Sequence, residues 1–172
     1  MEKINFCEGV VAQMMENEAW HDLSGDINWN ETQLEKYADK LDWDMVCSNR
    51  EMFWTISMIE KFKNRINWKA LSANYDRKSI SLAVLEKYAD KWDWSEISES
   101  RDLPMEVVEK FADRLNWSKV IENWHFCDEY ASEDFVRKFQ ERIPSGQFHN
   151  SNLWSSLVAK KKDELRNMVS ID

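Results

Sequence analysis

Glycine and proline are scarce in this sequence. Only three glycines and two prolines occur in 172 residues, against an average usage of about 7% and 5%. Tight β-hairpins need glycine at positive φ, so a protein with many hairpins would require far more of it. The shortage argues against an all-β fold.

Cysteine and long apolar runs are also rare. Cys7, Cys47 and Cys127 are widely spaced and form no CxxC or CxxH pair, which is typical of reduced thiols rather than of a disulfide framework or a zinc site. The N-terminal segment lacks the apolar stretch of a signal peptide. No run approaches the ~18 apolar residues of a membrane helix. We therefore expect a soluble, cytoplasmic protein that does not enter a membrane.

The familiar motifs of catalysis and cofactor binding are missing. The sequence has no GxGxxG, no Walker-type loop and no HExxH. One short cluster, His125-Phe126-Cys127 beside Asp128 and Glu129, has the residue types of a metal site or a Cys/His nucleophile pair. No further ligand cluster has suitable spacing, so a chance neighbourhood in a solvated loop is the better interpretation. We expect no cofactor, no metal and no enzymatic activity; an enzyme would need a site formed between loops.

Basic residues are outnumbered by acidic ones. The chain has 23 Lys and Arg against 32 Asp and Glu, a net charge of −9. Nucleic-acid binding rests largely on Lys and Arg that neutralise phosphates, so this balance counts against direct binding of nucleic acid. It suits a partner protein with a basic surface.

Tryptophan, by contrast, is abundant, with ten copies, and five of them follow a repeated pattern. The nine-residue copies are EKYADKLDW (35–43), EKFKNRINW (60–68), EKYADKWDW (86–94), EKFADRLNW (109–117) and a diverged RKFQERIPS (137–145). Self-similarity at a period of about 20–50 residues indicates a stack of repeated structural units.

The first half of each repeat predicts a helix with a defined start. Five positions before each motif stand the expected capping residues Asn30, Thr55, Ser81, Pro104 and Ser132. Apolar residues precede these caps and recur four positions after them, which is the pattern of a hydrophobic staple. Apolar positions then follow at steps of three and four, as in Leu34, Tyr37 and Leu41, which is a helical period.

The second half predicts a short helix that begins at tryptophan. Its W-x-x-(L/I/V) pattern occurs as Trp20/Leu23, Trp43/Val46, Trp68/Leu71, Trp94/Ile97 and Trp117/Val120. Asp or Asn precedes four of these tryptophans and would cap the helix. A single repeat cannot bury both its apolar stripe and its tryptophan, whereas stacked neighbours can.

These patterns predict an all-α fold, an α-solenoid of about five to six two-helix repeats of 23–28 residues each. We expect one domain over residues 1–172, with a cap and half repeat in 1–29, repeats in 30–148 and a capping helix in 149–172.

Specific residues should reveal how this stack is capped and packed. We expect the N-terminal cap to be a helix over residues 3–18. Leu153, Leu157 and Leu165 of the C-terminal helix would face the stack. The repeat tryptophans should be core residues, and the staple residues Trp29 and Trp54 half buried.

The loops between repeats vary and offer the candidate contacts. Segments 48–53, 73–79, 99–103 and 122–130 would line one edge of the stack. Aromatic residues are enriched in binding hot spots, and the region around 118–136 is acidic. The candidate partner-binding residues are Trp124, Tyr130, Asp128, Glu129, Glu133, Asp134 and Tyr75.

The repeated EK(Y/F)ADKxDWxx(I/L/V)S pattern resembles the short Trp-centred helical repeats of predicted proteins of large DNA viruses, phages and some bacteria. The resemblance covers residues 20–148 and assigns no activity. The fifth copy departs from it, with Arg137 in place of Glu and Ser145 in place of Trp. For a phage or mobile-element source, the resemblance implies a further candidate: a small acidic inhibitor that occupies the basic channel of a defence enzyme in the host cytoplasm.

Three functional hypotheses follow. The first is a non-catalytic scaffold or adaptor module that binds another protein through its variable surface. The second is an acidic, anti-CRISPR-like inhibitor whose segments 1–26 and 118–136 meet Lys and Arg on a nucleic-acid-dependent enzyme. The third is an RNA reader with one base per repeat, which is disfavoured because the repeat aromatics are expected in the core and the charge is wrong. Pairing of the exposed ends into a homo-oligomer is left open.

Overall fold

The computed structural model describes residues 9–75 and 80–170, and all regular structure in these ranges is helical. Thirteen helices and no strand occur there, which confirms the all-α prediction. Within the same ranges, no helix combines the length and the apolar character that crossing a membrane requires.

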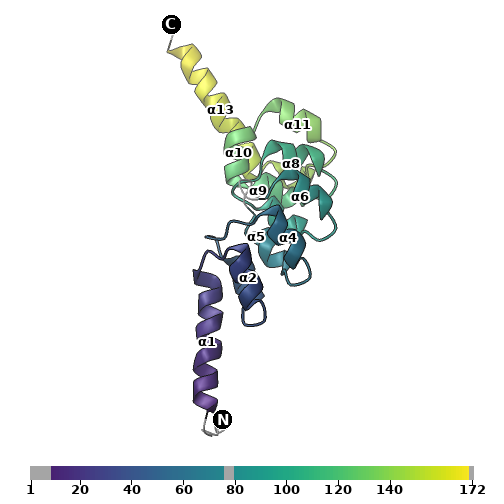
Figure 1. The fold of residues 1–172 in the computed structure, drawn as a ribbon. Helices are drawn as coiled ribbons and strands as arrows, with labels where there is room; N and C mark the ends of the chain where they lie inside the picture. The colour runs from purple at the N-terminus through teal and green to yellow at the C-terminus, as the bar shows by residue number, and fades with distance from the viewer. Residues whose placement is uncertain (1–8, 76–79, 171–172) are drawn as a thin grey trace. The chain divides into compact units, whose positions relative to one another are not determined.

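The chain divides into two compact units, one ending at Asn74 and one beginning at Tyr75 (Figure 1). The helices of the first unit are α1 (Val10–Asp26), α2 (Glu31–Tyr37), α3 (Trp43–Ser48), α4 (Ile56–Phe62) and α5 (Trp68–Ala73). Those of the second are α6 (Leu82–Lys87), α7 (Trp94–Ser98), α8 (Met105–Lys110), α9 (Trp117–Glu122), α10 (Trp124–Tyr130), α11 (Glu133–Phe139), α12 (Ser145–Phe148) and α13 (Asn152–Val169). A single domain with one solenoid through the whole chain stays a prediction.

The helices begin where the capping pattern predicts. The helices α2, α4, α6, α8 and α11 follow the five expected capping residues. Asn30, Thr55 and Ser132 each accept a hydrogen bond from the backbone N–H three residues later. The helices α3, α5, α7 and α9 each begin at a repeat tryptophan and are capped by the preceding Asp or Asn side chain.

Within each unit, a repeat tryptophan packs on the aromatic residue of the next copy of the motif. The ring centroids lie 4.5–5.2 Å apart in the pairs Trp20–Tyr37, Trp43–Phe62, Trp94–Phe111 and Trp117–Phe139. The indole N–H of Trp43, Trp94 and Trp117 also donates to the carbonyl of the motif alanine five residues earlier. Each of these indoles thus binds a carbonyl of its own motif copy and packs on the aromatic ring of the next copy.

The charged positions of the motif form ion pairs between successive copies. The second-position lysine contacts the first-position glutamate of the preceding copy in Lys61–Glu35, Lys110–Glu86 and Lys138–Glu109. The sixth-position arginine contacts the fifth-position aspartate of the preceding copy in Arg65–Asp39, Arg114–Asp90 and Arg142–Asp113. Exposed pairs of this kind contribute only about 0–1 kcal/mol each, but together they favour one register between neighbours.

A ladder of polar side chains, which the sequence analysis did not predict, joins the loops that follow α3, α5, α7 and α9. The sixth residue after each repeat tryptophan donates a hydrogen bond to a backbone carbonyl 22–25 residues earlier. The four bonds are Asn49 to Ile27, Asn74 to Asn49, Ser100 to Tyr75 and Asn123 to Ser100. The ladder pairs loop carbonyls that would otherwise lose water partners inside the fold.

The N-terminal prediction is wrong in one respect. We expected a helix over 3–18 followed by a separate half repeat at Trp20, but α1 runs without interruption from Val10 to Asp26; residues 3–8 lie outside the described ranges. Ala19 precedes Trp20, so the Asp or Asn cap that starts the other tryptophan helices is missing. The helix therefore continues.

The C-terminal helix α13 begins after Ser151, whose side chain accepts a hydrogen bond from the N–H of Trp154. Leu153 is buried and Leu157 is half buried, as predicted, but Leu165 is 51% exposed. With 18 residues, α13 is about 27 Å long, and its C-terminal half extends beyond α10, as Figure 1 shows. The prediction for Leu165 fails because the short helices on which α13 packs, α9 and α10, end too early to cover it.

The burial of the tryptophans also differs from the prediction. The staple residues Trp29 and Trp54 are fully buried rather than half buried. Of the repeat tryptophans, Trp94 and Trp117 are buried, whereas Trp20, Trp43 and Trp68 are partly exposed. The staple tryptophans precede the first helix of their repeat and enter the core. The indole N–H groups of Trp43 and Trp68 instead donate to carbonyls at the ends of α2 and α4, and that of Trp20 donates to the exposed Glu16 carboxylate.

Candidate functional site

The acidic segment that we expected to be a loop at 122–130 is in fact the helix α10. Asn123 caps it by accepting a hydrogen bond from the N–H of Phe126. Phe126 and Cys127 are buried, whereas Trp124, Asp128 and Glu129 are exposed. Other helices of this length were predicted because they belong to the repeated pattern, whereas α10 lies outside it, so the helix was missed.

The geometry of α10 separates the residues of the His125/Cys127 cluster. Cys127 lies in the core, where its Sγ–H is in contact with the carbonyls of Val120 and Ile121. Burial raises the pKa of this thiol to about 12, and burial does the same for Cys47. Among the described residues, no three or more His, Cys, Asp or Glu side chains gather in a way that could hold a metal ion. The arrangement favours the chance neighbourhood over a metal site or a nucleophile pair.

One hollow lies beside the start of α10. It has a volume of about 590 Å³ and is lined by Glu99, Ser118, Lys119, Glu122, Asn123, Trp124, His125 and Gln147. Trp124 is 59% exposed, and its ring lies 3.6 Å from that of His125, centroid to centroid. Lys119 forms an ion pair with Glu99, and the hydrogen bond that the ammonium donates to this carboxylate raises the pKa of the lysine.

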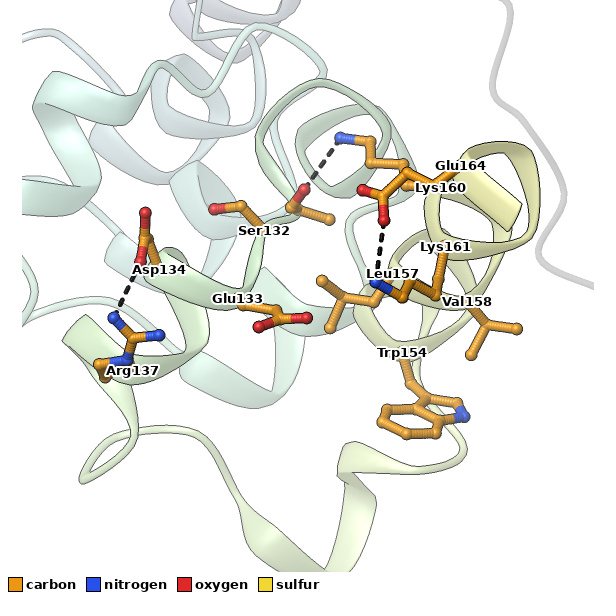
Figure 2. A pocket seen from close by; sticks show the side chains of 11 residues that line it. Ser132, Glu133, Asp134, Arg137, Trp154, Leu157, Val158, Lys160, Lys161 and Glu164 are labelled. Atoms are coloured by element: carbon orange, nitrogen blue, oxygen red, sulfur yellow. Dashed lines mark hydrogen bonds and ion pairs between the residues drawn. The ribbon is translucent and has the colours of Figure 1, made fainter. Parts of the chain in front are cut away.

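A second hollow, the α11–α13 groove, runs between these two helices and has a volume of about 580 Å³ (Figure 2). One wall is formed by Ala131, Ser132, Glu133, Asp134 and Arg137 at the start of α11, and the other by Trp154, Leu157, Val158, Lys160, Lys161 and Glu164 of α13.

The apolar part of the α11–α13 groove is anchored from behind. Trp154 packs against Phe148 and His149, with centroid distances of 5.4 and 4.6 Å. Leu157 and Val158 continue the apolar wall along α13. An aromatic side chain held in this way loses little freedom when a partner covers it, which favours binding.

The charged side chains of the groove are paired, with one exception. Arg137 contacts Asp134 at 3.1 Å, Lys161 contacts Glu164 at 2.9 Å, and the Lys160 ammonium donates to the carbonyl of Ala131. Glu133 makes no hydrogen bond or ion pair with the described residues, and Figure 2 shows its carboxylate directed toward α13. The pKa of Lys161 is raised, first by its hydrogen bond with Glu164 and also by the negative charge of Glu133.

The predicted contact residues are distributed over this region. Trp124 lines the first hollow, and Glu133 and Asp134 line the groove. Asp128 and Glu129 are exposed on α10 but belong to neither lining.

The two tyrosines predicted to bind a partner are less accessible. Tyr130 is partly exposed, with its ring 5.0 Å from that of Phe126. Tyr75 does not join the surface: it is only 6% exposed, and its carbonyl accepts a hydrogen bond from Ser100.

The sequence analysis missed the α13 side of the groove. The signal was present in Trp154, Leu157, Val158 and Lys161, which recur at steps of one, three and four. That α11 lies opposite α13 could not be predicted, because this contact joins residues about 20 or more apart in the sequence.

Comparison of the chain with models of protein families, with curated proteins and with solved structures gave no match.

Proposed function

We propose that this chain is a non-catalytic helical-repeat module that binds another protein, as a scaffold or adaptor, and that the α11–α13 groove is its docking site. The observation that carries the proposal is the composition of the groove: an anchored tryptophan and two aliphatic side chains, bordered by charged groups of both signs. Apolar centres with a polar rim are typical of protein interfaces.

The chemistry of the groove indicates what kind of segment would bind. Trp154, Leu157 and Val158 would receive apolar side chains of the partner. Glu133, the lining carboxylate that forms no ion pair with the described residues, would receive a Lys or Arg. The expected ligand is a helical or extended segment with an apolar anchor next to a basic residue, in keeping with a partner of basic surface.

The experiment begins with affinity capture from a lysate of the source organism or its host, at low and high salt, with identification by mass spectrometry. The affinity of the partner found is then measured for the wild-type chain and for Val158→Glu and Glu133→Lys. Both substitutions lie at exposed positions, so the fold should survive, which circular dichroism would verify. Each variant should weaken binding at least tenfold, since each leaves a charge unpaired against the partner.

Glu129→Lys is the matched control, because Glu129 is an exposed acid of α10 outside both hollows. It changes the net charge as Glu133→Lys does and should leave the affinity almost unchanged. Equal effects of the two reversals, or no effect of Val158→Glu, would refute the groove as the docking site. If Trp124→Ala abolished binding and the groove variants did not, the docking site would instead be the hollow at α10.

The acidic inhibitor is kept as a second candidate because of where the acids lie. Asp128, Glu129, Glu133 and Asp134 are all exposed on α10 and α11. For such an inhibitor, the captured partner would be a nucleic-acid-dependent enzyme, and affinity would fall steeply with salt. An affinity that is insensitive to salt would exclude this version. Direct binding of RNA is not expected, and a mobility shift of the protein with RNA at low salt would contradict both proposals.

A further inference from the structure

In the part of the chain that the structure describes, the two longest helices each leave one half exposed. In α1, the C-terminal half packs on α3, where Gly25 lies so close that a Cβ would meet Cε of Met45 at 2.9 Å. Its N-terminal half carries Val10, Val11, Met14 and Met15, which are 37–66% exposed. Because α1 has 17 residues and α3 only six, this half extends past its support.

The second uncovered half is the end of α13, beyond the α11–α13 groove. Leu165, Met168 and Val169 are 51–78% exposed there. Their steps of three and four place them on one side of the helix. Apolar stripes exposed at this density mark interaction surfaces, and neither stripe takes part in the groove described above.

The two stripes carry opposite charge. Helix α1 has four acids, Glu16, Glu18, Asp22 and Asp26, and no Lys or Arg. Helix α13 has four bases, Lys160, Lys161, Lys162 and Arg166, against two acids. Two copies of α1 would bring carboxylates together, and two copies of α13 would bring ammonium groups together. Attraction arises only when α1 of one chain meets α13 of another.

The order of residues along each helix sets the orientation. From N- to C-terminus, α1 presents a mainly apolar segment (10–15) and then two acids, Glu16 and Glu18. Helix α13 presents three lysines (160–162), two acids that pair with Lys161 and Arg166 of the same helix, and then a mainly apolar segment (165–169). Only an antiparallel arrangement places apolar against apolar and acid against base. Since both helices rise 1.5 Å per residue, Met14 level with Leu165 puts Val10 level with Val169 and Glu18 level with Lys161.

We propose that the uncovered half of α1 of one copy packs antiparallel on the uncovered half of α13 of a second copy. Because the two surfaces differ, one chain of the pair keeps its α13 surface free and the other keeps its α1 surface free. The contact is head-to-tail and can add further copies. Apart from Lys160 and Lys161, which also line the α11–α13 groove, this self-association uses residues outside the groove, and its apolar contact does not depend on the function proposed for the groove.

The test is sedimentation velocity of the full chain over a concentration series at low and high salt. The wild-type chain should gain mass with concentration beyond that of a dimer, and less so at high salt. Met14→Glu and Leu165→Glu change exposed side chains, and each alone should abolish association, since each removes one of the two surfaces. An equimolar mixture of the two variants should form a one-to-one dimer and nothing larger.

The mixture separates head-to-tail pairing from the alternatives. If α13 paired with α13, the Met14→Glu variant alone would still form dimers. If α1 paired with α1, the Leu165→Glu variant alone would still form dimers. Either result overturns the proposal, and so does a wild-type chain that stays monomeric at every concentration. Charge exchange gives an independent check. The exchange uses Lys162, which is next to Lys161 but outside the groove lining. Glu18→Lys and Lys162→Glu should each weaken association about threefold to tenfold, and the double variant should recover it. Failure of that recovery would refute the orientation.

Discussion

Asn123 joins two repeats through three hydrogen bonds of one buried side chain, and its removal is the most direct test of the stacking described above. Its amide donates to the carbonyls of Ser98 at 3.1 Å and Ser100 at 2.8 Å. Its Oδ1 accepts from the N–H of Phe126 and caps α10. The side chain is 7% exposed, so water cannot readily replace these partners.

The magnitude for Asn123→Ala follows from these three bonds. Loss of the cap costs about 1 kcal/mol, and each buried carbonyl left without its donor costs about 1–2 kcal/mol. The free energy of unfolding should therefore fall by about 3–5 kcal/mol. Asn152→Ala is the matched control, because Asn152 donates one bond to the carbonyl of Glu122 and does not cap its helix. Its loss should be about 1 kcal/mol or less.

Urea unfolding, followed by tryptophan fluorescence and by far-ultraviolet circular dichroism, measures both variants. The change in free energy is taken from the transition midpoint, provided that the dependence of the free energy of unfolding on urea concentration is the same in the variant and the wild-type chain. If the two units unfold separately, only the transition that contains α9 and α10 should move. A loss for Asn123→Ala no greater than that for Asn152→Ala would show that the amide ladder does not hold neighbouring repeats together.

Two further predictions concern the aromatic ladder and the thiols. Trp117→Phe should cost about 1 kcal/mol more than Trp54→Phe in the same urea assay. The Trp117 indole donates to a carbonyl, whereas the buried Trp54 indole N–H finds no hydrogen-bond partner among the described residues; equal losses would contradict this. In a Cys7→Ser chain, a thiol reagent near neutral pH should label neither Cys47 nor Cys127 until the protein unfolds, because burial raises both pKa values from 9.0 to about 12. Since unfolding restores the lower pKa, the two thiols should reduce stability as the pH rises from about 9 toward 12.

Much of the local structure could be predicted from the sequence because several independent signals agree in each repeat. Asn30 and Thr55, for example, are capping types at the right distance from the motif, and each begins a helix in the structure. Apolar steps of three and four then identify the buried side of that helix. Short helices with strong ends depend mainly on nearby residues, which is why this part of the fold is readable.

The polar ladder and the groove depend on partners far along the chain and were therefore missed. The regularity of Asn49, Asn74, Ser100 and Asn123 is nevertheless visible once it is sought, since each stands six residues after a repeat tryptophan. A short polar side chain in a loop has many local roles, so its period alone did not reveal that it binds the preceding loop. Tyr75 was misplaced for the same reason, because its burial is decided by distant residues.

The fifth copy of the motif keeps the positions that contact the preceding copy and changes those that would contact a following one. This difference gives a reason to expect the binding surface at the groove. The motif has a direction: its lysine, arginine and aromatic positions contact the preceding copy, and its first glutamate and its tryptophan serve the following one. The fifth copy keeps the first set, with Lys138 on Glu109, Arg142 on Asp113 and Phe139 on Trp117.

The second set has changed in this copy. Arg137 replaces the glutamate and Ser145 replaces the tryptophan. Arg137 now lines the α11–α13 groove and pairs with Asp134 of its own helix. An edge that receives no further repeat is released from the demands of stacking, so its side chains are free to serve another partner. The departure of this copy from the pattern is thus a reason to look for function at the edge where it occurs.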